Sequence, residues 1–267
     1  MSDIESWPAL GASPLRASPL DGGAVPPAPE LDEPACAPNR TLDLAELERP
    51  DYRYVLAHMD AILEATPGAY LHPGKRWEYP WALEQAALRA GERVLDVGCG
   101  RSIFPLYLAA AGMRVTALDL EVDDALSRPL GLSVDWVPGD MTALPLPGAA
   151  FDAVFCISVI EHLPDAQAPR AMAELHRVLR PGGRLLLTTD LYDDASAEIW
   201  YEGADRRFQV DWAVFDEARL RRLILAAPGF ALEGTLDLSV DWEQVKPRMR
   251  EYHGYPYTSV GVKLIRI

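Results

Sequence analysis

A glycine-rich turn follows an apolar strand in the segment Val94-Leu-Asp-Val-Gly-Cys-Gly-Arg-Ser102. Gly98 and Gly100 have no Cβ, so a ligand can approach their backbone closely. A helix expected after the turn would present free N–H groups to that ligand. Asp96 stands at the end of the strand, where a carboxylate is costly unless it orients the loop or meets a polar ligand. The segment therefore predicts a ligand site, with a tight turn that binds nothing as the alternative.

A second carboxylate, Asp119, follows the next apolar stretch, Arg114-Val-Thr-Ala-Leu118. At the tip of the second strand of such a unit, a carboxylate can accept hydrogen bonds from both hydroxyls of a ribose. The dinucleotide pattern would need glycine at position 103, where Ile103 stands, so a nicotinamide cofactor is disfavoured. An acid that only caps the following turn is the alternative. Because Asp119 occurs together with the glycine turn, ribose binding is the favoured interpretation.

The elements that would position these residues alternate between strand and helix. Strands are expected at 93–97, 114–118, 133–137, 152–157, 184–189, 230–238 and 259–267, and helices at 42–63 with a break at Pro50, 81–90, 103–111, 166–179 and 216–226. This alternation predicts an α/β fold with a mostly parallel sheet covered by helices on both faces. Sheets of this kind bind ligands at the carboxyl ends of their strands.

Five motifs in this order and spacing resemble the class I S-adenosylmethionine-dependent methyltransferases. They are Val94-Leu-Asp-Val-Gly-Cys-Gly100, Ala117-Leu-Asp119, Pro138-Gly-Asp-Met141, Phe151-Asp-Ala-Val-Phe-Cys-Ile-Ser-Val-Ile-Glu-His-Leu163 and Leu179-Arg-Pro-Gly-Gly-Arg-Leu-Leu-Leu187. The last two look most like the branch typified by ubiquinone and menaquinone biosynthesis methyltransferases. The resemblance runs from Trp81 to the C-terminus and implies a Rossmann-like, doubly wound sheet of seven mostly parallel strands, the last antiparallel. Ser102 stands where the family often has a third glycine.

The resemblance implies S-adenosyl-L-methionine as cofactor, and the three scattered cysteines suggest no metal site. The loop residues would surround its methionine part, Asp119 would bind the ribose, and Leu120 would lie against the adenine. Asp140 and Met141 would contact the adenine, and Ser158 would lie beneath the sulfonium. Arg76 could pair with the cofactor carboxylate, because a guanidinium suits that geometry. The cofactor-binding residues expected are Asp96, Gly98, Cys99, Gly100, Asp119, Leu120, Asp140, Met141, Ser158 and Arg76.

Aromatic residues on both sides of the core are candidates for the substrate site. Trp77 and Tyr79 precede the first strand and could wall the methyl-transfer cavity, where aromatic faces favour a sulfonium. Alternatively, they fasten the amino-terminal helix to the sheet. Tyr192 and Tyr201 fall in the region of about 190–215, where this fold commonly inserts a substrate lid.

Methyl transfer needs a base only when the acceptor arrives protonated. The candidates for proton transfer are His162, His253 and Asp190. A structural role for His162 and a packing role for His253 are the alternatives. In-line displacement at the methyl carbon otherwise requires the protein to hold the two reactants in place and to exclude water.

The composition divides the chain into three parts. Of the 267 residues, 1–40 form a Pro- and Ala-rich acidic stretch expected to be a flexible arm, 41–90 a helical cap, and 91–267 the core. The formal net charge of −15 disfavours nucleic acid as a partner. No secretory signal or membrane span is expected, and three scattered cysteines suggest a reduced, cytoplasmic protein.

These features predict methyl transfer from S-adenosylmethionine to a small molecule. O-methylation is favoured by family frequency, followed by N- and C-methylation. A protein methyltransferase, or a cofactor-binding protein of the same fold that does not methylate, remains the alternative. The acceptor itself and the oligomeric state, monomer or homodimer, are left open.

Overall fold

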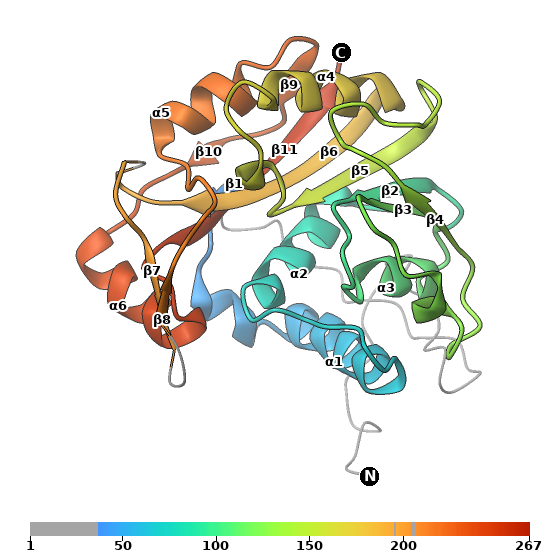
Figure 1. Cartoon of the computed structure of the whole chain (residues 1–267), viewed down its shortest axis with the longest axis horizontal. Helices are drawn as coiled ribbons and strands as arrows, with labels where there is room; N and C mark the ends of the chain where they lie inside the picture. Colours follow the sequence, from blue (N-terminus) through green and yellow to red (C-terminus); the bar gives the residue numbers. More distant parts are fainter. Residues whose placement is uncertain (1–36, 195, 204–206) are drawn as a thin grey trace.

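The computed structural model describes residues 37–194, 196–203 and 207–267, and a mixed β-sheet forms its centre (Figure 1). The core strands are β2 (Arg93–Val97), β3 (Arg114–Asp119), β4 (Val134–Pro138), β5 (Phe151–Ile157), β6 (Leu179–Leu191), β9 (Phe230–Leu232) and β11 (Thr258–Arg266). From β6 the order runs β6-β5-β2-β3-β4, all parallel, while β11 pairs antiparallel with both β6 and β9. The predicted doubly wound sheet with an antiparallel last strand is therefore confirmed.

The sheet has nine strands instead of the seven expected, because two short strands extend it beyond β11. They are β1 (Asn39–Thr41), antiparallel to β11, and β10 (Leu236–Asp237), parallel to β1. The side chain of Asn39 is fully buried and bonds backbone on both sides, donating to Glu233 O at 2.8 Å and accepting from Lys263 N at 2.5 Å. Asn39 and Arg40 thus belong to the sheet and not to the predicted arm, whose residues 1–36 lie outside the described residues.

Helices cover both faces of the sheet (Figure 1). One face carries α1 (Pro50–Ala65), α2 (Lys75–Ala86) and α3 (Phe104–Ala110), and the other carries α4 (Ala168–Val178) and α5 (Glu217–Leu220) with its extension η4 (Arg221–Leu225). The period-2 alternation of the strands divides their side chains between the two cores. In β6, Leu186 packs with the α1–α3 core, and Leu185 and Leu187 pack with the α4–α5 core.

Helix α2 differs from the prediction, which placed a helix at 81–90. The helix runs from Lys75 to Ala86 and ends at Ala87, which has a φ of 45°. Pro80 lies inside it and removes one helical hydrogen bond. Trp77 and Trp81, one turn apart, are fully buried and stack at 5.9 Å. Their burial offsets the cost of the proline.

The carboxyl-terminal part holds further differences. The predicted strand 230–238 is divided at Gly234, which has a φ of 81°, into β9 and β10. Helix α6 (Trp242–His253) was not predicted from the sequence. The predicted lid region contains a β-ribbon of β7 (Trp200–Glu202) and β8 (Arg207–Gln209). The remaining described elements are three short 3₁₀-helices, η1 (Leu44–Glu48), η2 (Asp124–Ser127) and η3 (Ile160–His162). None of the helices described is long and apolar enough to cross a membrane.

Candidate active site

The glycine loop after β2 is shaped by two positive φ angles, 72° at Gly98 and 51° at Gly100. A Cβ on Gly98 would lie 2.5 Å from the Val159 side chain, and one on Gly100 would lie 2.9 Å from the hydroxyl of Tyr70. The N–H groups of Gly98 and Cys99 both donate to Leu118 O, at 2.7 and 3.1 Å. A larger side chain at either position would therefore be strained, and the loop is fastened to the end of β3.

Asp119 ends β3 and connects the glycine loop to the loop that follows β3. Its Oδ2 accepts from the N–H of Gly100 at 2.8 Å, and its Oδ1 accepts from its neighbour Leu120 at 2.7 Å. The carboxylate is only partly buried, so a ligand can reach it. The Leu120 side chain is 73% exposed and presents an apolar surface beside it. A diol next to a flat ring matches this arrangement chemically.

The remaining predicted cofactor residues of the core lie along the same edge of the sheet. Asp140, exposed after β4, accepts from Thr142 N at 2.7 Å, which holds the pKa of Asp140 below its usual range. Met141 is buried behind it. Ser158 follows β5 with a φ of 51°. Asp96 at the end of β2 is 4% exposed, and burial raises its pKa to about 8.

A cavity of about 250 Å³ adjoins this edge at Ser158. Its lining contains aromatic, imidazole and acidic side chains from widely separated parts of the chain. The lining residues are Tyr70, His72, Gly74, Lys75, Glu78, Ser158, Glu161, His162, Asp190, Trp212, His253, Tyr255, Tyr257 and Ser259. The predicted catalytic candidates His162, His253 and Asp190 are thus brought together with Ser158.

An ion pair in α2 that the sequence did not reveal forms the floor of this cavity. Glu78 is buried, and its Oε2 accepts from Lys75 Nζ at 2.8 Å, Ser158 Oγ at 2.7 Å and Thr188 Oγ1 at 2.8 Å, while Oε1 accepts from Ser259 Oγ at 3.0 Å. Burial alone would raise the pKa of Glu78, but Lys75 and these hydrogen bonds lower it. Glu78 is therefore a saturated anion that orients Ser158.

Two other acids face the cavity in a different state. Asp190 Oδ2 accepts from Trp212 Nε1 at 2.7 Å, and burial together with the charge of Glu78 raises the Asp190 pKa to about 7. Glu161 accepts from Thr189 Oγ1 at 3.3 Å, and burial raises its pKa well above the usual value. A carboxyl group that titrates near neutral pH can take up a proton from an acceptor.

The two histidines have different environments. His253 is buried, and its Nδ1 accepts from Tyr255 N at 3.2 Å, so in the neutral ring Nε2 carries the proton. Burial lowers the His253 pKa to about 4, and Nε2 has no hydrogen-bond partner among the described residues. His253 therefore suits a donor better than the base predicted for it. His162 is exposed, with its ring 5.3 Å from that of Trp212, and partial burial together with the charge of Lys75 lowers its pKa.

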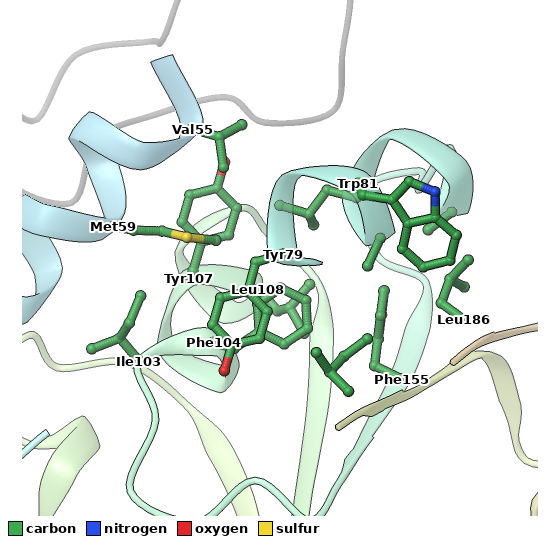
Figure 2. Packing of buried hydrophobic residues seen from close by; sticks show 14 of the residues in the cluster. Val55, Met59, Tyr79, Trp81, Ile103, Phe104, Tyr107, Leu108, Phe155 and Leu186 are labelled. Carbon is green, nitrogen blue, oxygen red and sulfur yellow. The ribbon is translucent and has the colours of Figure 1, made fainter. Parts of the chain in front are cut away.

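Three predicted residues before β2 do not line the cavity. Arg76 forms a two-pronged pair with Asp60 of α1, at 2.8 and 2.7 Å, and does not line the cavity. Trp77 is fully buried and donates to Glu46 Oε2 at 2.6 Å. Tyr79 stacks on Phe104 at 4.3 Å within the core (Figure 2). The structure supports packing roles for these aromatic residues and a surface ion pair for Arg76.

Tyr192 and Tyr201, the two substrate-site candidates after β6, do not line the cavity. Tyr192 packs edge-on against Trp242 at 5.5 Å, with Lys246 Nζ 4.6 Å from its ring centre. Tyr201 of the β-ribbon lies 4.9 Å from Tyr255, which does line the cavity. Tyr201 therefore supports the wall, and Tyr192 belongs to the contact with α6.

Comparison with known proteins also shows similarity to methyltransferases. Residues 95–187 match the family model described as a methyltransferase domain. The chain is 36% identical over 116 residues to a ubiquinone biosynthesis O-methyltransferase of Pseudomonas aeruginosa, covering 41% of this chain and 48% of the relative. It is 42% identical over 102 residues to a malonyl-[acyl-carrier protein] O-methyltransferase of Serratia marcescens, covering 37% and 38%. The matches thus span less than half of these two relatives.

Among solved structures, the [4+2]-cyclase SpnF superposes with a TM-score of 0.54 at 22% identity, covering 81% of this chain and 94% of that one. This likeness concerns the fold alone. The family match spans β2 to β6, the strands that carry the glycine loop, Asp119, Asp140 and Ser158. Residues 95–187 therefore match a methyltransferase domain, and the chain is similar over the aligned stretches to these two curated O-methyltransferases.

Proposed function

We propose that this protein transfers a methyl group from S-adenosylmethionine to a small-molecule acceptor, with an oxygen as the favoured target. The observation that carries the proposal is the junction at Ser158. There the edge of the sheet that holds the glycine loop and Asp119 meets a cavity of about 250 Å³ lined by polar and aromatic side chains. Both curated relatives described above are O-methyltransferases by name.

The cofactor would lie along the carboxyl ends of β2 to β5. The glycine loop would hold its methionine part, Asp119 its ribose hydroxyls, and Leu120, Asp140 and Met141 its adenine. When bound, the cofactor supplies a sulfonium methyl that is already electrophilic. The chain itself would then have to hold the acceptor in line with that methyl group and exclude water.

Asp190 is the residue that we assign to proton uptake. It lines the cavity, its orientation is fixed by Trp212, and its pKa of about 7 suits an acceptor that arrives protonated. His253, with its free Nε2–H, would donate a hydrogen bond to the acceptor. The segment 41–90 would form the cap of the site, and the region of about 190–215 its lid.

The size of the cavity favours a small acceptor over a protein or nucleic acid. We also expect the protein to act in the cytoplasm. The decisive experiment is calorimetric titration with S-adenosylhomocysteine, followed by mass spectrometry of a metabolite extract incubated with the protein and S-adenosylmethionine. Binding together with the gain of one methyl group on a small molecule supports the proposal. Binding with no methyl transfer to any extract component would favour the non-methylating alternative, and absence of binding would refute the cofactor assignment.

A further inference from the structure

We infer that the acceptor carries a cationic nitrogen, such as a protonated amine, which is held by Asp190 and Glu161 beside the aromatic rings of the cavity. This inference rests on the proposed function, because it concerns the acceptor side of the same site. It identifies a charge that the acceptor bears, whether or not that nitrogen receives the methyl group.

The charges that line the cavity exclude an anionic acceptor. Among the described lining residues, Lys75 is the one permanent cation, and its ammonium is engaged by Glu78 at 2.8 Å and by Ile157 O at 3.0 Å. The lining imidazoles of His72, His162 and His253 all have lowered pKa values, so they are neutral at pH 7. A carboxylate or phosphate ligand would therefore meet no available positive charge there.

The two acids, by contrast, form no ion pair among the described residues, and the charge of Lys75 only partly offsets the burial that raises their pKa values. Glu78 is saturated by four donors, whereas Asp190 accepts from Trp212 and Tyr257, and Glu161 accepts a longer bond of 3.3 Å from Thr189. Both acids are at least nine-tenths buried. A buried carboxylate is costly without a cation within about 4–6 Å, and a ligand cation would supply it.

Aromatic rings complete the environment that a cation prefers. Trp212, whose indole N–H is fixed on Asp190, lies edge-on to Tyr255 at 5.8 Å, and Tyr255 stacks on Tyr257 at 4.9 Å. All three residues line the cavity. The negative faces of such rings attract an ammonium group most strongly where water is excluded. Carboxylates and aromatic faces together are thus complementary to an organic cation.

The sulfonium of the cofactor is the competing partner for these acids. It would account for Asp190 and Glu161 if they served the bound cofactor and not the acceptor. The two cases differ in a measurable way. Acids that serve the sulfonium distinguish S-adenosylmethionine from neutral-sulfur S-adenosylhomocysteine, whereas acids that serve the acceptor distinguish acceptors by charge.

The test uses the full chain saturated with S-adenosylhomocysteine and three probes that share a phenol ring: tyramine, 4-ethylphenol and 4-hydroxyphenylacetate. These probes are cationic, neutral and anionic at pH 7. We expect tyramine to bind at least tenfold more tightly than 4-ethylphenol, and 4-hydroxyphenylacetate to bind most weakly. Calorimetry in two buffers of different ionisation enthalpy should also show proton release with tyramine, because the cation favours the ionised acid.

The variants Asp190→Asn and Glu161→Gln should each remove most of the preference for tyramine, and Asp190→Asn should also reduce the proton release. Asp194→Asn, an exposed acid close in sequence, serves as the control and should leave both unchanged. If only one of these two variants folds, that variant is enough for the comparison. The probe series in the unmodified protein tests the inference independently.

The inference would be overturned if the three probes bound similarly, if the anion bound most tightly, or if tyramine did not bind. In each of these cases, binding of S-adenosylhomocysteine would still support the proposed function. The inference would also be overturned if Asp190→Asn weakened S-adenosylmethionine relative to S-adenosylhomocysteine but left tyramine unaffected. Failure of the unmodified protein to bind S-adenosylhomocysteine would instead refute the proposed function.

Discussion

The backbone N–H of Gly100 donates to Asp119 Oδ2 at 2.8 Å, so the loop after β2 is joined directly to the tip of β3. The carboxylate also keeps an exposed side from which a ligand can be bound. Asp119 therefore has two roles that can be separated by experiment. It organises the glycine loop, and in the proposed function it binds the ribose of the cofactor.

Replacing Asp119 with Ala is expected to weaken S-adenosylhomocysteine binding by about 10- to 100-fold, because hydrogen bonds to a charged group contribute about 1.5–3 kcal/mol. Calorimetric titration measures the change. Asp124→Ala is the control, since this exposed acid pairs only with Arg128 among the described residues. Equal affinity in the Asp119 variant and the unmodified protein would show that the cofactor does not contact this carboxylate.

Gly98→Ala and Gly112→Ala form a matched pair. Both glycines have positive φ angles, 72° and 84°, but a Cβ on Gly112 meets no atom within 4 Å, whereas one on Gly98 meets Val159 at 2.5 Å. We expect Gly112→Ala to reduce the free energy of unfolding by about 1 kcal/mol through backbone strain, and Gly98→Ala to reduce it further. Urea unfolding compares the two variants.

The close approach at Gly98 can be isolated by adding a second substitution. Val159→Ala removes the contacting methyl groups, so Gly98→Ala combined with Val159→Ala should be more stable than the sum of the two single changes predicts. Strict additivity would mean that the contact does not constrain this loop.

Arg76→Ala is expected to leave S-adenosylhomocysteine affinity within twofold of the unmodified protein. The guanidinium is engaged with Asp60, and both side chains are more than one-third exposed, so the loss of stability should stay below about 1 kcal/mol. Thermal unfolding measures the change in stability, and calorimetric titration measures the affinity for S-adenosylhomocysteine. A tenfold loss of cofactor affinity would restore the role that the sequence suggested for Arg76.

The free energy of unfolding should fall as the pH rises from 6.5 to 8. Asp96 has a pKa of about 8 in the folded protein and near 4 when unfolded, so between these values only the folded chain holds its proton. Raising the pH therefore favours unfolding, by about 1.5 kcal/mol over this window. The pKa of Asp190, about 7, acts in the same direction. His253 acts oppositely, but only below about pH 6.5.

Asp96→Asn should flatten this pH dependence, and Asp135→Asn, an exposed acid on β4, should not. Urea unfolding at pH 6.5 and pH 8 provides the comparison. A pH dependence that persists unchanged in Asp96→Asn would show that Asp96 ionises normally in the folded protein.

The strands and the glycine loop could be predicted because their signals are local. An apolar run followed by Gly98 and Gly100 specifies a strand and a turn with little help from the rest of the chain. The start of α2 could not be predicted in this way. Pro80 argues against a helix locally, and only the burial of Trp77 and Trp81 against distant strands reverses that preference.

The cavity shows a second limit of sequence reasoning. Asp190 and His253 could be named as candidates because acids and imidazoles perform proton transfer in many enzymes. Glu78 could not, because its partners Ser158, Thr188 and Ser259 lie 80, 110 and 181 residues away. Its role follows from burial and from these partners, which no local pattern specifies.

Glu78→Gln tests how strongly this floor depends on charge. The change keeps the shape of the side chain but leaves the mostly buried ammonium of Lys75 without its counter-ion, which should cost about 3–5 kcal/mol of stability. Combining it with Lys75→Met should restore part of that loss, because the unpaired charge is then absent. Urea unfolding of the two single variants and the double variant measures the coupling. A double variant as unstable as the sum of the singles would show that the hydrogen bonds to Ser158 and Thr188, and not the ion pair, hold Glu78 in place.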